Sequence, residues 1–111
     1  MRIGEFLSDI GRPVAYYPQL ARAVGSVNAA IMLCHLLSFA VDKDEQGGWI
    51  ARTSAQLEED TGLSRRQQDS ARAQLRTIGL VEERLFGLPA KLQYRVAHEV
   101  FGRILAGLRR G

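Results

Sequence analysis

The sequence predicts a mainly helical α+β domain in which two adjacent short helices are followed by a β-hairpin. Two capping boxes, which mark the starts of helices, begin at Thr53 and Ser64, and a glycine lies between them. Apolar residues then alternate along residues 91–96, as in a strand that buries one face. The length of 111 residues, with 46% hydrophobic and 24% charged residues, is that of one globular domain.

Three helices are expected before the first capping box. The first is short and amphipathic, and its apolar residues are Ile3, Phe6, Leu7 and Ile10. After a short extended segment, Pro18 begins a second helix that ends before Gly25. Ser26 caps a third, largely apolar helix over residues 27 to about 41, which is expected to form the centre of the core. A turn and a short strand over residues 49–52 follow.

The two capped helices form a helix-turn-helix arrangement. The first is predicted over Ser54–Asp60 and the second over Arg65–Ile78. Gly62 supplies the positive φ of the turn, and Leu63 points into the core. Because apolar residues fix the inner face of the second helix, Gln68 is expected to point partly inward. A helix, a four-residue turn that contains glycine, and a second capped helix are the parts of this motif.

A hairpin and a last helix complete the predicted domain. The hairpin has strands over Leu80–Leu85 and Lys91–Val96, joined by the loop Phe86–Ala90, and a helix follows over His98–Arg110. A hairpin directly after a helix-turn-helix is a wing. The sequence therefore predicts one winged helix-turn-helix domain over residues 1–111, with extra N- and C-terminal helices. Its parts are the helix-turn-helix over about 53–78, the wing over about 80–96 and the C-terminal helix over about 98–110.

The second helix of the motif carries most of the candidate DNA-binding residues. In a helix-turn-helix this helix enters the major groove, where arginine pairs with guanine and glutamine with adenine. We expect Arg66 and Gln67 to contact bases, and Arg65 and Arg76 to contact phosphates. The full candidate set is Thr53, Ser64, Arg65, Arg66, Gln67, Ser70, Arg72, Arg76, Arg84, Lys91 and Arg95. The net charge of +3 does not identify the partner by itself, but the clustering of cations favours double-stranded DNA.

Two features favour a protein partner instead of DNA. The carboxylates of Glu58–Asp60 would repel a nearby phosphate. The predicted hairpin tip, Phe86–Pro89, is apolar, whereas a wing that reads DNA normally carries arginine or lysine there. Because a winged helix can also serve as a protein-docking module, a host protein is the alternative partner.

The sequence contains no pattern typical of a catalytic or metal site. Its single cysteine, Cys34, excludes an internal disulfide framework and a CxxC metal knuckle. The adjacent His35 lies on a different helix face, so the two form no dyad, and His35 is expected to be structural. We expect no enzymatic activity, no cofactor and no metal. Without a signal peptide or an apolar stretch long enough to span a bilayer, the chain is expected to be cytoplasmic and to have no membrane partner.

The C-terminal helix carries the candidate dimerisation residues, which form one apolar stripe. They are Val100, Phe101, Ile104, Leu105 and Leu108. This stripe and the one in the N-terminal helix exceed what a minimal winged-helix core needs. They could pair within one chain or across a two-fold axis. We predict a homodimer, because a single winged domain reads one half-site and a dimer reads two.

Five segments carry a recognisable set of motifs, with GRPVAYYPQLA, TGLSRRQ, GLVEE and GLPAKLQY among them. They are Pro13–Ala21, Trp49, Thr53–Gln67, Leu75–Glu82 and Gly87–Tyr94. In combination they resemble the winged-helix domain of phage replisome organisers and plasmid replication initiator proteins. The resemblance implies DNA binding in replication initiation or in transcriptional regulation of a phage, a plasmid or another mobile element. A replisome protein is a further candidate partner. The alternative is a small phage protein that binds a host protein, such as an inhibitor of a host defence complex.

Overall fold

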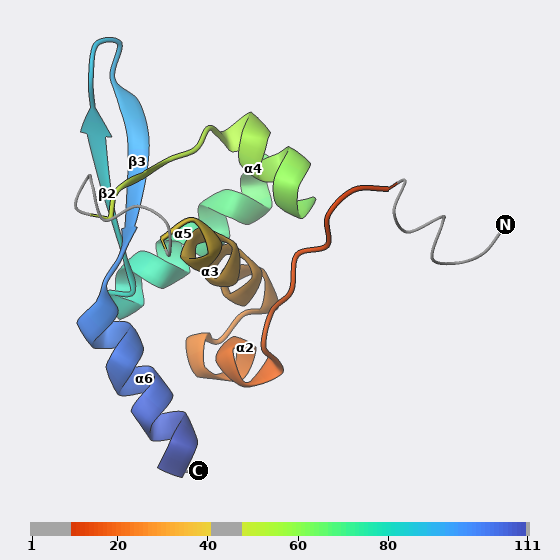
Figure 1. Ribbon diagram of the computed structural model, residues 1–111, viewed down its shortest axis with the longest axis vertical. Helices are drawn as coiled ribbons and strands as arrows, with labels where there is room; N and C mark the ends of the chain where they lie inside the picture. Colours follow the sequence, from red (N-terminus) through yellow and green to blue (C-terminus); the bar gives the residue numbers. More distant parts are fainter. Residues whose placement is uncertain (1–9, 41–47, 111) are drawn as a thin grey trace, which may run out of the picture.

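The structure is a computed structural model that describes residues 10–40 and 48–110. Within these ranges it is an α+β domain of five helices and a three-stranded antiparallel sheet (Figure 1). The helices are α2 (Pro18–Val24), α3 (Val27–Ala40), α4 (Ser54–Thr61), α5 (Arg65–Ile78) and α6 (His98–Arg110), and the strands are β1 (Ile50–Ala51), β2 (Val81–Phe86) and β3 (Lys91–Val96). The predicted N-terminal helix, except Ile10, and most of the predicted turn before Trp49 lie outside the described residues.

The helices α2 and α3 follow the sequence prediction. Proline at the first position of α2 has no N–H to lose and already has a helical φ. The helix ends at Gly25, whose φ of 81° is left-handed and whose N–H donates to the carbonyl of Ala21. At the start of α3, the hydroxyl of Ser26 accepts a hydrogen bond of 3.1 Å from the backbone N–H of Ala29.

The helices α4 and α5 begin at the two predicted capping boxes. The hydroxyl of Thr53 accepts a hydrogen bond of 3.1 Å from the N–H of Gln56, and that of Ser64 accepts one of 3.2 Å from the N–H of Gln67. In both boxes the glutamine side chain accepts the reciprocal bond. Gly62, with a φ of 78°, ends α4 and lets the chain turn into α5. The predicted helix–turn–helix succession is confirmed at the level of secondary structure.

The sheet has the strand order β1-β3-β2. In the hairpin, Val81 is opposite Val96 and Phe86 is opposite Lys91, so β2 is shifted by one residue from its predicted bounds. The strand β1 is shorter than the predicted 49–52 by one residue at each end, and Arg52, directly after it, pairs with a carboxylate of α4. The hairpin projects beside α4 and the N-terminal half of α5 (Figure 1).

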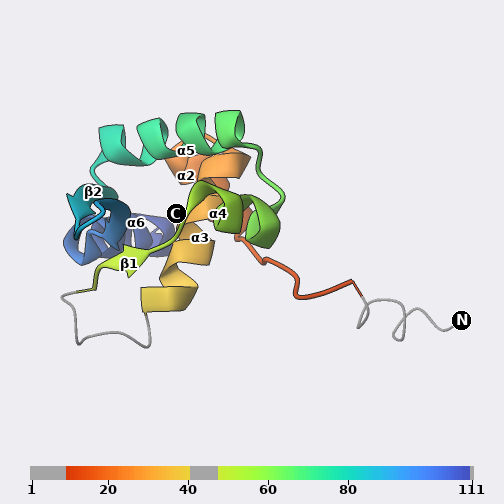
Figure 2. The ribbon, with the colours of Figure 1, turned by 90° about the horizontal axis from the view of Figure 1, so that it is seen from above.

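The core lies between α3, its neighbouring helices and the inner face of the sheet. The helix α3 packs against α2, α5 and β3, and the largest fully buried apolar side chains are Met32, Leu33, Leu36, Leu57, Leu75, Leu80 and Val24. Figure 2 shows α5 running along one side of the molecule towards the base of the hairpin. The core thus fixes α5 and the hairpin relative to each other.

The apolar stripe of α6 takes part in this same core. Four of its five candidate dimerisation residues, Val100, Phe101, Ile104 and Leu108, are partly buried against the core, whereas Leu105 is 38% exposed. The sequence suggested that this stripe exceeds what the core of one protomer needs. In the structure, most of the stripe is part of that core. The homodimer stays a prediction, with Leu105 as the exposed member of the set.

The succession of helices and the hairpin is consistent with a winged-helix-like topology. In the described ranges no single helix is long and apolar enough to cross a membrane, and α2 with α3 reaches that length only as a pair bent by 114°.

Candidate nucleic-acid interface

A groove of about 460 Å³ separates the hairpin from α5 and from the start of α4. Predicted site residues from three segments line it, because α4 and α5 begin where the hairpin passes them. Among the lining residues are Arg52, Thr53, Arg65, Asp69, Arg72 and Lys91. The walls of this groove therefore carry more cations than carboxylates.

The first turns of α5 present Arg65, Arg66 and Ser70 to solvent, as the sequence predicts. Among the described residues, neither arginine has a carboxylate partner. Arg65 lines the groove. These two guanidinium groups can therefore meet an anion or a base edge without first breaking an ion pair with a described residue.

Three other candidate residues, Thr53, Ser64 and Gln67, use polar side-chain atoms in the capping boxes. The Oε1 of Gln67 accepts a hydrogen bond of 2.9 Å from the N–H of Ser64. A paired contact of Gln67 with adenine would need the same oxygen as an acceptor. The side chain of Gln67 is therefore already engaged in holding the start of α5, and a base contact would have to share its Oε1.

The neighbouring Gln68 is buried between α4 and α5, with 2% of its surface exposed. Its Nε2 donates to the carbonyls of Ser54 (3.0 Å) and Leu63 (2.9 Å), and its Oε1 accepts from the hydroxyl of Ser54 (3.1 Å). The predicted inward direction of this residue is confirmed, and it joins the two helices of the motif.

Two candidate arginines of α5 are paired with one glutamate of the hairpin. Arg72 donates to both carboxylate oxygens of Glu83 at 2.9 Å, and Arg76 lies 2.9 and 3.0 Å from the same two oxygens. Arg72 also reaches Asp69, one helical turn before it, at 3.3 Å. We call these four residues the Glu83 cluster. A phosphate contact by Arg76 would compete with this existing pair.

The electrostatics of the Glu83 cluster favour its ionised form. Burial alone would raise the pKa of Glu83, but the hydrogen bonds and charges of Arg72 and Arg76 outweigh burial and hold this pKa below its usual range. The hydrogen bond with Glu83 in turn raises the pKa of Arg72. The cluster therefore keeps its charges near neutral pH and ties α5 to the base of the hairpin.

The other two candidate arginines lie on the outer face of the sheet, opposite the core. Arg95 donates to Glu82 at 2.6 Å, and its guanidinium lies 4.5 Å from the ring centroid of Trp49. The Nε of Arg84 donates to the Oε1 of Gln93 at 2.8 Å. Arg95 is thus already paired with a carboxylate, whereas Arg84 has no carboxylate partner among the described residues.

The end of the hairpin is apolar and exposed. Leu85, Phe86 and Leu88 have 72%, 57% and 101% of their surface exposed. Lys91, at the start of β3, is also exposed. The apolar tip does not pack onto the core of its own chain, so its side chains remain available for a partner.

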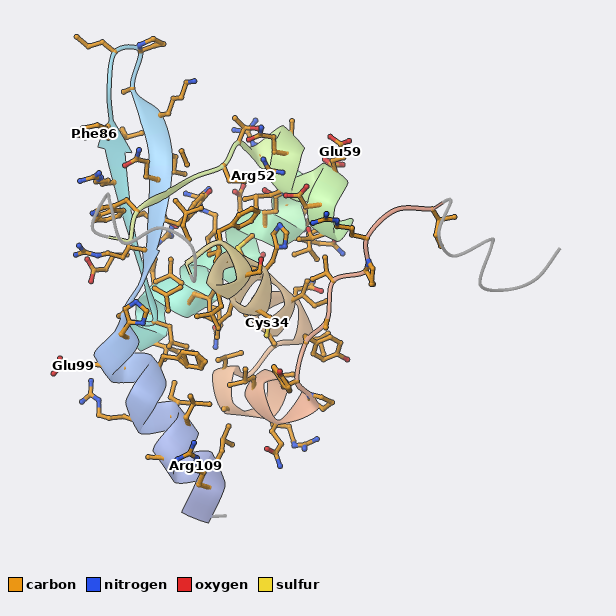
Figure 3. The ribbon with its side chains drawn as sticks, in the orientation of Figure 1. Cys34, Arg52, Glu59, Phe86, Glu99 and Arg109 are labelled. Atoms are coloured by element: carbon orange, nitrogen blue, oxygen red, sulfur yellow. The ribbon has the colours of Figure 1, made fainter. Side chains whose placement is uncertain are left out.

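One ion-pair network was not predicted from the sequence. Asp60 accepts hydrogen bonds from Arg52 (2.8 and 2.9 Å) and pairs with His35 at 2.9 Å, and Arg52 lies beside α4 in Figure 3. Burial would raise the pKa of Asp60, but the hydrogen bonds with His35 and Arg52 lower it below its usual value. Asp60 therefore stays ionised, and its charge is balanced by Arg52. Glu58 and Glu59 are the exposed carboxylates of that run. His35 has the structural role expected for it.

Cys34, the single cysteine of the chain, lies on α3, outside the candidate interface. Burial raises the pKa of the Cys34 thiol, which keeps it protonated near neutral pH. Within the described ranges, no three histidine, cysteine, aspartate or glutamate side chains are grouped to hold a metal ion.

Sequence reasoning missed Glu83, Trp49 and Arg52 as parts of the site. Glu83 was the one with a signal, since Arg72 and Arg76 lie one helical turn apart and could share a carboxylate. Which residue of the hairpin supplies this carboxylate depends on how the hairpin packs across α5, and the sequence does not show that packing.

No protein-family model matches this sequence, and neither a curated protein nor a solved structure gives a match to the chain.

Proposed function

We propose that this chain is a winged helix-turn-helix protein that binds double-stranded DNA, with α5 in the major groove and the hairpin as its wing. Its role would be replication initiation or transcriptional regulation of a phage, a plasmid or another mobile element, as the sequence motifs imply. The proposal includes no catalytic step.

The observation that carries the proposal is the pair of exposed arginines at the start of α5. Arg65 and Arg66 project from the first turn of a helix that runs along one side of the molecule (Figure 2). Lys91 lines the opposite wall of the adjoining groove. A guanidinium binds two acceptors of guanine or of a phosphate at once. This geometry therefore suits contacts with the base edges and the backbone phosphates of the major groove.

Fluorescence anisotropy with a labelled random-sequence duplex tests the proposal. The double variant Arg65→Ala, Arg66→Ala is expected to weaken duplex binding by about tenfold or more, since each good base or phosphate contact contributes about 1–3 kcal/mol. The matched control is Arg103→Ala with Arg109→Ala, which removes the same charge from α6 at the far end of the molecule (Figure 3). Equal affinities of wild type and the α5 variant would refute the assignment of α5.

A protein partner is the second candidate, and the exposed apolar tip favours it. Leu88 has its full surface exposed, and the four residues after Phe86 contain no charge. If duplex binding is absent in wild type at low salt, the protein partner replaces DNA as the proposal. If duplex binding is present and Leu88→Ser leaves it unchanged, Leu88 takes no part in DNA binding and stays available to a protein partner.

We also propose that the protein acts as a homodimer that reads two half-sites. Because Phe101 and Ile104 pack on the protomer core, Leu105→Glu is the suitable probe of an interface on α6. Light scattering at micromolar concentration is expected to give about twice 12.3 kDa for wild type and one chain for the variant. A wild-type mass of one chain would refute the dimer without affecting the assignment of α5.

A further inference from the structure

The outer face of the sheet holds one arginine between two aromatic rings. The guanidinium carbon of Arg84 lies 4.3 Å from the ring centroid of Trp49 and 4.4 Å from that of Phe86. Phe86 is on the hairpin towards its tip (Figure 3), and Trp49 immediately precedes β1. The two rings come from segments that the sheet brings together, so the sandwich is a product of the fold.

The hydrogen bonds of Arg84 leave its two outer amino groups unused within the described chain. Its Nε donates to Gln93, and no described residue accepts from its Nη1 or Nη2. No fully buried side-chain nitrogen in the described ranges lacks a partner, so solvent reaches these two groups at least in part. A guanidinium presents its paired N–H donors in one plane, and the two ring contacts together with the hydrogen bond to Gln93 restrict the motion of this side chain.

This arrangement differs from that of four other arginines near the interface. Arg72 and Arg76 are paired with Glu83, Arg52 with Asp60, and Arg95 with Glu82. Arg84 is held by rings and an amide, and its positive charge has no counter-charge among the described residues. A partly buried cation of this kind is stabilised when an anion completes it.

We infer that Arg84 forms a preorganised binding site for one phosphate group on the outer face of the sheet. A phosphate presents two oxygens at the spacing of the guanidinium fork. The stacked rings have already restricted the side chain, so binding loses less conformational entropy than at a free arginine. The source of the phosphate is the backbone of the duplex, and this part of the inference rests on the proposed function.

The site has a built-in reporter, because Trp49 is the single tryptophan of the chain. Titration of wild type with inorganic phosphate at constant ionic strength is expected to change Trp49 fluorescence and to shift the Arg84 Nε–H and Trp49 indole N–H resonances with saturation. Arg84→Gln is expected to abolish the saturable change, and Arg84→Lys to weaken it, since lysine lacks the planar fork. Arg109→Gln, which removes the same charge from α6, is expected to leave it intact. A wild-type response that is absent or does not saturate overturns the site, even if a variant fails to fold.

A second experiment, which measures duplex binding, identifies the source of the phosphate. Arg84→Gln is expected to weaken duplex binding about tenfold and to reduce the slope of log affinity against log salt by about one, as for the loss of one phosphate contact. If phosphate saturates the site but Arg84→Gln leaves duplex affinity unchanged, the duplex is refuted as the source while the site and the role of α5 stand. If wild type binds phosphate but no duplex, the proposed function fails and the site remains.

Discussion

Glu83 decides which arginines of α5 can meet an anion. Its carboxylate accepts hydrogen bonds from Arg72 and Arg76, which lie one helical turn apart. The side chains of Arg72 and Glu83 are 22% and 12% exposed, so water screens their interaction less than that of a surface pair. Removing one partner of such a pair leaves a charge with poor solvation. The stability of the domain should therefore depend on the protonation of Glu83.

Replacing Glu83 with glutamine is expected to lower the free energy of unfolding at neutral pH by about 2 kcal/mol. Because the folded pKa of Glu83 is lowered, its contribution is complete above the ordinary glutamate pKa of 4.5 and is lost as the pH falls through the lower folded value. Denaturant unfolding of both proteins across acidic pH should show the difference between them closing below pH 4.5.

The control for this prediction is Glu82→Gln, because the pair of Glu82 with Arg95 is more than a third exposed on both sides. Its effect on unfolding should stay within about 0.5 kcal/mol. Equal effects of the two substitutions would show that the Glu83 cluster gives no special stability.

The buried Gln68 makes a second residue-scale prediction. Gln68→Ala removes three hydrogen bonds between α4 and α5 and leaves the Leu63 carbonyl and the Ser54 hydroxyl without this partner, so we expect a loss of about 2–3 kcal/mol in unfolding free energy. Gln19→Ala, at an exposed glutamine of α2, should change it by no more than about 0.5 kcal/mol. Thermal unfolding of the two variants measures the difference, and similar melting curves would contradict it.

Among the elements, the helices were more predictable than the contacts between them. The bounds of α2 and α5 match the prediction because each has a start signal and a terminal glycine, and those signals are local. The strand β1 was predicted one residue too long at each end, and the pairing of Arg52 with Asp60 was missed because it is a tertiary contact. The packing of α6 onto the core was left open, since a stripe shows that a helix has a partner without showing which one.

Glycine substitutions should have opposite effects in two elements. Gly62→Ala places a Cβ at a φ of 78°, in the turn between α4 and α5, and should cost about 1 kcal/mol although the space is open. Gly107→Ala in α6 also meets open space but has no left-handed backbone, so it should stabilise the domain by up to about 1 kcal/mol. Melting temperatures that move in the same direction for both variants would contradict this prediction.

At the scale of the molecule, fewer candidate cations lack a carboxylate partner among the described residues than the sequence suggested. Of the seven candidate cations, Arg72, Arg76 and Arg95 are paired with glutamates, which leaves Arg65, Arg66, Arg84 and Lys91. The residue types of the site could be read from the sequence. The ion pairs of these residues could not be predicted from the sequence. Glu83 meets Arg72 and Arg76 because the hairpin packs across α5, and Glu82 meets Arg95 because of the strand register.

These four cations set the expected salt dependence of duplex binding. With about 0.9 counterions released per phosphate, the slope of log affinity against log salt for one protomer should be near −2.7 if Arg66 contacts a base and near −3.6 if it contacts a phosphate. Anisotropy titrations over a range of salt concentrations measure it. A slope near −6 would mean that the Glu83 cluster and the Arg95 pair open when DNA binds.

The hairpin is anchored to the core at its base only, and its tip is exposed. Its strands of six residues span about 20 Å at ~3.3 Å per residue, and the attached end is where Val81 and Val96 enter the core beside Glu83. Over that length, a tilt of about 5° at the base displaces the tip by about 2 Å. The angle of the hairpin at its base therefore sets the distance between the tip and the start of α5. Changing Glu83 would alter this distance in addition to releasing Arg72 and Arg76.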